Sequence, residues 1–411
     1  MTATRRVQTK ITFPVPRSPF PKQPFLPLLR FLPLLLLLAA CADPKSTPKP
    51  SNTSEPGVTR FSPNTQRLYN YLTDIYGSYT LSGQMDTSWT TNTSIDMITR
   101  VYNDTGKYPA IKGFDLIQLP FDNGREQVNE AIDWWKGQNN YAKLLSDKPD
   151  IHGIVTFCWH WKVKNSTSSV SDFRPNTTDF RIPMKDGQLD KSSAAFTKTI
   201  KPDLDKAAAA LQQLKEKDIP VLWRPLHEAA GNWSATNPNG AWFWWGSSGP
   251  EAYIALWEYM YDYFTNEKGL DNLIWVWNGQ NYMWVPNPAT VDIVGYDWYP
   301  WPHDTPQAAR NYQSQAALFN RVEAMVNDGK PRMVAMSENG AIPDPDNCKT
   351  DNAMWLWFCT WNDKTNEGKD DEENFWTGEW HNTGAHKQKV YNHDLVITLD
   401  KLPDLTKYRL E

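Results

Sequence analysis

Two glutamates are candidates for chemistry because each follows a short apolar segment and has aromatic side chains close to it in sequence. Glu228 comes after residues 221–225 and Glu338 comes after residues 333–336. Cleavage of a glycosidic bond needs one carboxyl group to protonate the leaving oxygen and another to stabilise an oxocarbenium-like centre. A single glutamate at a strand end is usually a solvated surface acid. Two in such surroundings favour a catalytic pair, since burial near tryptophan raises the pKa of a proton donor toward neutrality.

The elements that would position this pair are short apolar segments separated by amphipathic ones. Short, largely apolar runs are typical of strands buried on both faces. Their alternation with helical stretches predicts an α/β fold of the (β/α)8 TIM-barrel type, in which the ends of strands four and seven face each other across the barrel mouth. We predict strands at residues 79–82, 110–114, 151–157, 221–225, 273–277, 292–295, 333–336 and 354–358, and helices at residues 191–217, 251–264 and 306–326.

Other kinds of catalytic site lack their required residues. A zinc protease would need a histidine four residues after His227, where Gly231 stands. The sequence contains no Gly-x-Ser-x-Gly motif and no Cys-x-x-Cys pair, which argues against a serine hydrolase elbow and a structural zinc site. The acidic run at residues 370–373 has no EF-hand spacing and is expected to be a solvated loop. We therefore expect neither a metal nor a cofactor.

Charge and tryptophan content narrow the class of partner. The formal net charge is −5, and without the six basic residues of the first forty the chain has 36 basic against 47 acidic side chains. Such an acidic surface argues against nucleic acid. The 21 tryptophans suit carbohydrate, whose sugar rings pack on flat apolar faces. Trp284, Trp298 and Trp301 lie in predicted loops and are subsite candidates. We expect a monomer.

The N-terminal segment has the features of an export signal. Residues 1–40 are basic and then apolar, and the run at residues 31–40 is too short to span a bilayer. Leu-Ala-Ala-Cys at residues 38–41 resembles a bacterial lipobox, which predicts lipidation of Cys41 and a protein exported and anchored to a bacterial membrane, in the periplasm or at the cell surface. Ordinary signal cleavage, with Cys41 a bystander, is the alternative. Residues 41–60 are rich in Pro, Ser and Thr and predict a tether, and residues 61–411 predict one catalytic barrel domain.

Four segments of the chain resemble glycoside hydrolase family 26, whose best-known members are β-mannanases. Their order and rough spacing extend across the region from about residue 61 to the C-terminus. The segments are Trp-Arg-Pro-Leu-His-Glu at residues 223–228, Trp-Phe-Trp-Trp-Gly at residues 242–246, Tyr-Asp-Trp-Tyr at residues 296–299 and Ser-Glu-Asn-Gly at residues 337–340. The resemblance implies a retaining endo-β-1,4-mannanase acting on mannan, glucomannan or galactomannan.

The resemblance also implies roles for the residues of these motifs. Glu228 would be the acid and base, and Glu338 the nucleophile. Arg224 would lie beneath Glu338 and keep it ionised, because a positive charge lowers the pKa of a neighbouring carboxyl group. Tyr299 would donate a hydrogen bond to Glu338, and His227 would orient the nucleophile near the cleaved sugar.

Three further side chains would form the walls of the substrate cleft. By the same resemblance Trp242 stacks on the sugar beyond the cleavage point, and His160 lines the subsite just before it. Trp361 would form the floor under the distorted sugar, with Trp355 and Trp357 as alternatives close by.

One departure from the family pattern leaves the cleavage mode open. Residues 232–240 lengthen the loop between Glu228 and the aromatic motif, and this could close or widen the cleft. A chain-end mannobiohydrolase, or a β-glucanase or xylanase with the same mechanism, therefore remains an alternative. A surface lipoprotein that binds glycans without cleaving them is the alternative from another class. The presence of both Glu228 and Glu338 argues against it.

Overall fold

The computed structural model describes residues 60–87, 96–119, 124–137, 151–168, 170–364 and 369–410. The predicted signal peptide, Cys41 and nearly all of the predicted tether lie outside these residues. Among the helices that are described, none is long and apolar enough to cross a membrane.

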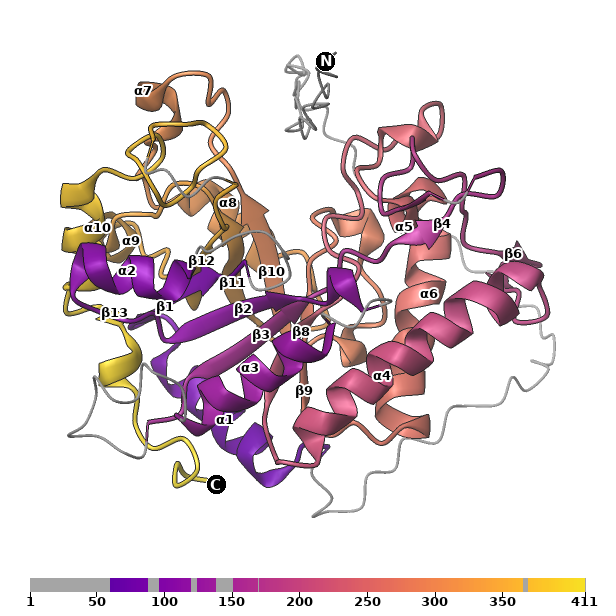
Figure 1. Cartoon of the computed structure of the whole chain (residues 1–411), viewed down its shortest axis with the longest axis horizontal. Helices are drawn as coiled ribbons and strands as arrows, with labels where there is room; N and C mark the ends of the chain where they lie inside the picture. Colours follow the sequence, from indigo (N-terminus) through magenta and orange to yellow (C-terminus); the bar gives the residue numbers. More distant parts are fainter. Residues whose placement is uncertain are drawn as a thin grey trace, which may run out of the picture.

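Eight parallel strands of the described chain close into a barrel, because the last of them pairs with the first. Their order around the barrel follows their order in the sequence. Figure 1 shows these strands in the middle of the molecule with helices outside them. The strands are β1 (Thr80–Met85), β2 (Ile111–Asp115), β3 (Ile154–Cys158), β8 (Val221–Arg224), β9 (Leu273–Trp277), β10 (Ile293–Trp298), β11 (Met333–Asn339) and β12 (Trp357–Thr360).

The barrel strands are apolar along most of their length because both of their faces are covered. Every residue of β9 is buried, and so is every residue of β2, β3, β8 and β11. A strand enclosed by the barrel interior on one side and by helices on the other has no solvent face that would require alternation. The polar residues in these strands are therefore buried too, and they concentrate toward the C-terminal ends.

Helices cover the outside of the barrel, and small antiparallel pairs extend its loops. Helices α3 and α4 pack against one another, and α1 contacts β9. The helices are α1 (Pro63–Ile75), α2 (Met97–Thr105), α3 (Gly124–Lys136), α4 (Lys201–Lys215), α5 (Trp244–Ser247), α6 (Pro250–Asp262), α7 (Pro306–Ala309), α8 (Ala316–Glu323), α9 (Pro345–Thr350) and α10 (Gly384–Tyr391). The pairs are β4 (Val163–Lys164) with β5 (Ser171–Asp172) and β6 (Met184–Lys185) with β7 (Gln188–Leu189), and β13 (Val396–Ile397) joins β1.

All eight predicted strands overlap strands of the barrel, which confirms the predicted fold. The predicted helix at residues 306–326 is wrong as a single element, because it is divided into α7 and α8. Tertiary hydrogen bonds account for the break. The carbonyl of Tyr312 accepts from the amide of Asp344, and that of Ser314 accepts from the indole of Trp355, so neither is left to a continuous helix. Gln315 then adopts a left-handed conformation before α8 begins.

The three cysteines of the described chain are unpaired and buried. Cys348 lies in α9 and Cys359 lies in β12. Cys348 and Cys359 therefore do not form a disulfide with each other in this structure.

Candidate active site

Glu228 is positioned by the sharp turn that follows β8. The backbone of Leu226 and of Glu228 is in the left-handed region, with φ of 52° and 51°. Residues other than glycine rarely adopt this conformation. The amide of Glu228 donates to the carbonyl of Asn278, just beyond β9, at 2.7 Å. Such backbone strain is maintained only where the surrounding structure fixes it, and it is typical of functional sites.

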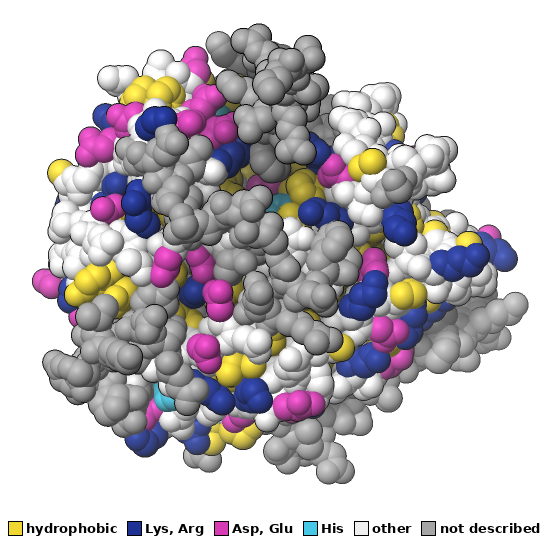
Figure 2. All heavy atoms as spheres, in the orientation of Figure 1, with side chains coloured by type: hydrophobic (Ala, Val, Ile, Leu, Met, Phe, Trp, Pro, Cys, Tyr) yellow, Lys and Arg dark blue, Asp and Glu magenta, His cyan; other side chains and the backbone are white. Residues whose placement is uncertain are grey.

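Glu338 reaches the same place from β11. The pairing of β11 with β10 and with β12 changes register near this residue, so the strand is irregular where Glu338 lies. Carboxylate oxygens of Glu228, Asp297 and Glu338 lie within 4.8 Å of one another. In Figure 2 a histidine is visible between apolar side chains in the upper middle of the molecule. Three carboxyl groups this close together are also a possible cation site. In this structure the guanidinium of Arg224 pairs with two of them, Asp297 and Glu338.

A buried network lies beneath the two glutamates, with Arg224 and Asp297 at its centre. Arg224 pairs with Asp297 at 2.7 Å and also contacts Glu338. Asn278 and Ser337 each donate to Asp297 at 2.7 Å. Every member is a charged or strongly polar group taken out of water, and each gains partners that offset this cost. The network therefore fixes the position of Glu338 from below.

Tyr299 holds Glu338 from the other side. Its hydroxyl donates to the second carboxylate oxygen of Glu338 at 2.9 Å, while Arg224 contacts the first. Both oxygens are thus occupied, which limits rotation of the carboxyl group. The structure places Arg224 and Tyr299 against Glu338 as the sequence resemblance implied.

The two glutamates differ in what surrounds their charge. Burial, together with Asp297 and Glu338, raises the pKa of Glu228 well above its ordinary value. Burial and Asp297 also raise the pKa of Glu338, to about 7, although Arg224 and His160 pull it downward. Because the guanidinium and the tyrosine hydroxyl stabilise the charged form of Glu338, we assign the first proton lost from the pair to Glu338. Glu228 then keeps its proton, as a general acid must.

This order predicts the pH dependence of turnover. The active form has Glu338 ionised and Glu228 protonated. The value of kcat/KM should therefore rise as the pH increases through about 7, where Glu338 loses its proton. It should fall again at higher pH, where Glu228 also loses its proton and can no longer act as the acid. Initial rates on a soluble oligosaccharide across the pH range would check this. A rising limb near the ordinary glutamate value would mean that Arg224 outweighs burial and Asp297.

Two histidines lie beside the carboxylates and contact each other. The Nε2 atoms of His160 and His227 are 3.3 Å apart, and the rings meet edge to face. His227 is fully buried, and burial, together with the charge of Arg224, lowers its pKa well below the ordinary value, so its ring is neutral. Among the described residues, the polar contact of the His227 ring is with His160 rather than with Glu338. This differs from the role in orienting the nucleophile that the resemblance implied.

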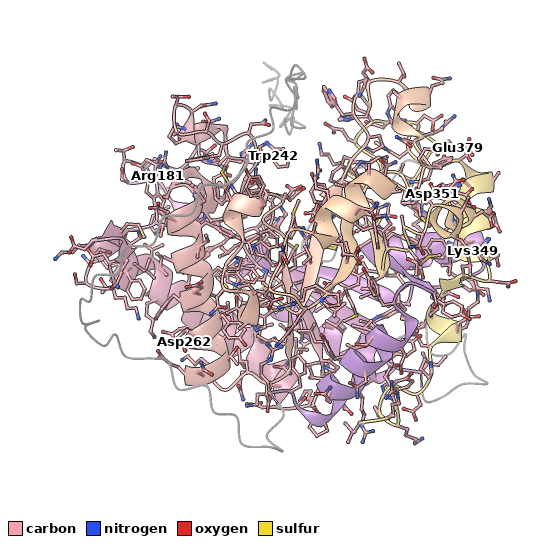
Figure 3. All side chains as sticks on the ribbon, turned by 180° about the vertical axis from the view of Figure 1, so that it is seen from behind. Arg181, Trp242, Asp262, Lys349, Asp351 and Glu379 are labelled. Atoms are coloured by element: carbon pink, nitrogen blue, oxygen red, sulfur yellow. The ribbon has the colours of Figure 1, made fainter. Side chains whose placement is uncertain are left out.

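Aromatic side chains surround the histidines. The ring of Trp361 lies 5.8 Å from that of His160, and both side chains are partly exposed. Trp242 is also partly exposed, and its indole packs beside Gly231. Figure 3 shows Trp242 and Arg181 at the top of the same half of the molecule. The structure thus brings Trp361 to the carboxylates' neighbourhood and leaves Trp242 on the rim.

Several other tryptophans serve packing rather than the cleft. Trp244 and Trp245 are fully buried, and the indole of Trp245 donates to the carbonyl of His227 at 2.8 Å, so they support the site from behind. Trp284 was a subsite candidate, and that prediction is wrong, because it is 1% exposed and packs against Trp233. Trp301 is 48% exposed and stays a candidate.

The long loop at residues 232–240 is closed on itself. The amide of Asn232 donates to the carbonyl of Gly240 at 2.9 Å. A side chain at Gly240 would come within 2.2 Å of the Asn232 carbonyl oxygen, so only glycine allows this closure. Arg181 donates to Asn239, and the Trp233 ring meets that of Trp284 at 5.6 Å. The loop is therefore fixed to the barrel rim at several points.

Sequence reasoning missed three buried polar residues of the site. Asp297 and Ser337 lay inside motifs that were recognised, but no role was given to either. Asp115 was missed because the predicted strand ended one residue before it, whereas β2 ends at Asp115 itself. A polar residue at the end of an apolar strand is the signal that could have found Asp115 and Asp297.

Comparisons with known proteins agree with this geometry. Residues 59–401 match Glycosyl hydrolase family 26. The chain is 33% identical over 341 residues to "Mannan endo-1,4-beta-mannosidase" of Thermothelomyces thermophilus, a match that covers 82% of this chain and 60% of the relative. It spans 49–60% of the length of the first curated relatives that it matches.

Solved structures show the same fold. A Podospora anserina GH26-CBM35 beta-(1,4)-mannanase is 31% identical with a TM-score of 0.66, over 88% of this chain and 72% of that one. A beta-mannanase from a symbiotic protist of the termite Reticulitermes speratus, complexed with gluco-manno-oligosaccharide, is 28% identical with a TM-score of 0.63, over 83% and 94%. With a family match over most of its length and a barrel that carries paired glutamates after strands four and seven, the chain belongs to glycosyl hydrolase family 26.

Proposed function

We propose that the protein is a retaining endo-β-1,4-mannanase. The observation that carries the proposal is the approach of Glu228 and Glu338, whose carboxylate oxygens lie within 4.8 Å of each other. Retaining glycosidases hold their carboxyl groups about 5–5.5 Å apart, whereas inverting enzymes leave about 6.5–9.5 Å for a water molecule. The relatives named as mannan endo-1,4-beta-mannosidases support β-mannan as the substrate class.

The first half of the reaction forms a covalent glycosyl-enzyme. Glu228 donates its proton to the glycosidic oxygen, which leaves with the bonding electrons as an alcohol. Glu338 attacks the anomeric carbon from the opposite face and forms an ester bond to it. Arg224 and Tyr299 hold the attacking carboxylate of Glu338 in place. Their interactions with Glu338 weaken as the ester forms, because the carboxylate then loses its negative charge. Asp297 remains as the counter-charge of Arg224 throughout.

The second half hydrolyses that ester. Glu228, now ionised, takes a proton from water, and the resulting hydroxide attacks the anomeric carbon while Glu338 leaves as a carboxylate. Both glutamates return to their starting states, and the anomeric configuration is retained. His160 and Trp361 line the subsite of the cleaved sugar in this proposal, with His227 behind His160 and Trp242 on the leaving-group side.

Product analysis tests the substrate and the cleavage mode together. The purified protein would be incubated with linear mannan, galactomannan, β-glucan and xylan, and the products resolved by size over time. We expect a ladder of manno-oligosaccharides from mannan and none from glucan or xylan. Release from glucan or xylan instead would overturn the mannan assignment and leave the two-glutamate mechanism. No product from any polymer would favour a glycan-binding protein.

A chain-end enzyme is the second candidate, and the fixed loop at residues 232–240 is the observation that favours it. A loop closed by Asn232 and Gly240 and held by Arg181 could block one end of the cleft. Mannobiose alone from the first minutes of the reaction would support this candidate. Deleting residues 233–239 should then restore a ladder of longer products.

We also propose that the protein is exported and held at a bacterial membrane through a lipid on Cys41. The support is the basic and apolar N-terminal sequence followed by Leu-Ala-Ala-Cys at residues 38–41. Replacing Cys41 with serine should move the protein from the membrane fraction to the soluble exported fraction. Unchanged membrane attachment would overturn the proposal.

A further inference from the structure

Asp115 lies at the C-terminal end of β2 and contacts His160 twice. One carboxylate oxygen accepts from the His160 amide at 2.9 Å, and the other lies 2.5 Å from Nδ1 of the ring. The first oxygen also accepts from the amide of Ile117 at 3.0 Å. The side chain of Asp115 is 1% exposed. All of these contacts lie at the mouth of the barrel, and among the described residues Asp115 makes no hydrogen bond to either glutamate.

These contacts fix where the ring protons lie. Burial raises the pKa of Asp115, but the charge of His160 and the hydrogen bonds outweigh this effect and hold that pKa below its usual value. An ionised carboxylate can only accept, so Nδ1 of His160 must carry a hydrogen. When the ring of His160 is neutral, its Nε2 is therefore a bare acceptor, and Nε2 of His227, 3.3 Å away, donates to it. The carboxylate of Asp115 thus determines which ring nitrogen carries the hydrogen in both His160 and His227.

We propose that Asp115 is a positioning residue for catalysis, which acts by fixing the ring orientation and the Nδ1–H tautomer of His160. The proposal rests on the proposed function, in which His160 lines the subsite of the cleaved sugar. Asp115 reaches neither the sugar nor the two glutamates. Its effect is transmitted through His160, whose Nε2 is directed toward His227 at the wall of the subsite.

Asparagine in place of Asp115 should move the hydrogen of the His160 ring from Nδ1 to Nε2. The oxygen that accepts from the amides of His160 and Ile117 must remain an oxygen, because both partners are donors. The amide nitrogen of asparagine would then face Nδ1 of His160, and a donor there requires Nδ1 to be bare. His160 would carry its hydrogen on Nε2 instead, directly against the Nε2–H of His227. One of the two rings must then change tautomer or turn.

Turnover gives the first test. We expect Asp115→Asn to lower kcat/KM on a manno-oligosaccharide about 10- to 100-fold, the range for losing one hydrogen bond to a charged group. The loss should fall on kcat, since the contact matters where the sugar is distorted. Asp86→Asn is the matched control, because Asp86 is buried at the end of the neighbouring β1 and pairs with Lys112 at 2.8 Å. It should keep activity close to wild type.

A double-substitution cycle separates positioning from a structural role. If Asp115 acts through His160, adding Asp115→Asn to His160→Ala should cost no further activity. A loss that adds fully to that of His160→Ala would overturn the proposal. Thermal unfolding of each variant would show whether the barrel stays folded.

The tautomer can be read without any turnover. The protein has seven histidines, so 15N-labelled imidazoles can be followed by NMR, with His160 assigned from its loss in His160→Ala. At a pH of about 9, where neutral rings are observed, we expect Nδ1–H at His160 in the wild type and Nε2–H in Asp115→Asn. An unchanged tautomer would overturn the proposal. This readout holds even if no polysaccharide is cleaved, which would refute the proposed function alone.

Discussion

Replacing Glu338 with alanine should lower turnover of mannan by at least about 10⁴-fold, because removal of a covalent nucleophile leaves only binding and general acid catalysis. The space left by the side chain should admit azide. Added azide would then attack the anomeric carbon of an activated β-mannoside from the nucleophile's side, with Glu228 still in place, and give the α-mannosyl azide. Initial rates with and without azide, and the anomeric configuration by NMR, would measure this.

The matched control is Glu251→Ala, which removes the same side chain from the exposed first turn of α6. It should keep full activity and show no response to azide. Retained turnover in Glu338→Ala would mean that the nucleophile lies elsewhere. Glu338→Gln would guard against a folding defect, because glutamine keeps the shape that Arg224 and Tyr299 enclose.

Glu228→Ala should affect substrates unequally, and this inequality identifies the acid and base. On polymer the loss should be at least about 100-fold, since the leaving sugar oxygen needs a proton and general acid catalysis contributes about 10²–10⁴. An aryl mannoside with an acidic phenol needs less help to leave, so its glycosylation step should be nearly normal. The glycosyl-enzyme should then accumulate, because no base activates the water.

The product formed with azide also distinguishes Glu228→Ala from Glu338→Ala. Azide needs no base, so it should restore turnover of the aryl mannoside in Glu228→Ala and give the β-mannosyl azide, the opposite anomer from that expected of Glu338→Ala. Equal losses on polymer and aryl mannoside, with no rescue, would contradict the role of Glu228. A glycan-binding protein would show neither turnover nor azide products in any variant.

The eight predicted strands could be found from sequence because a strand buried on both faces must be apolar along its length. Residues 273–277 were predicted with the bounds that β9 has, since Leu-Ile-Trp-Val-Trp has no competing helical pattern. The helix at residues 306–326 could not be delimited in this way. Its interruption depends on Trp355 and Asp344, which lie more than twenty residues further along the chain.

The contacts of Glu338 were predictable only in part. Arg224 and Tyr299 lay in recognised motifs, and the structure places both against it. The resemblance also implied that Arg224 keeps Glu338 readily ionised. The pKa of Glu338 is instead raised to about 7, because burial and Asp297 outweigh the guanidinium. The pKa of Glu338 depends on how deeply its carboxyl group is buried and on its distances to Asp297 and Arg224. A sequence motif specifies neither.

The barrel, the two glutamates and their placement after strands four and seven are predictable from the amino-acid sequence, because hydrophobic periodicity and strand-end position are local properties of the chain. The contact of Asp115 with His160, the contact of His227 with His160 and the burial of Trp284 depend instead on tertiary packing. Each of these contacts joins residues far apart in sequence, and the pairing of neighbouring barrel strands brings them together.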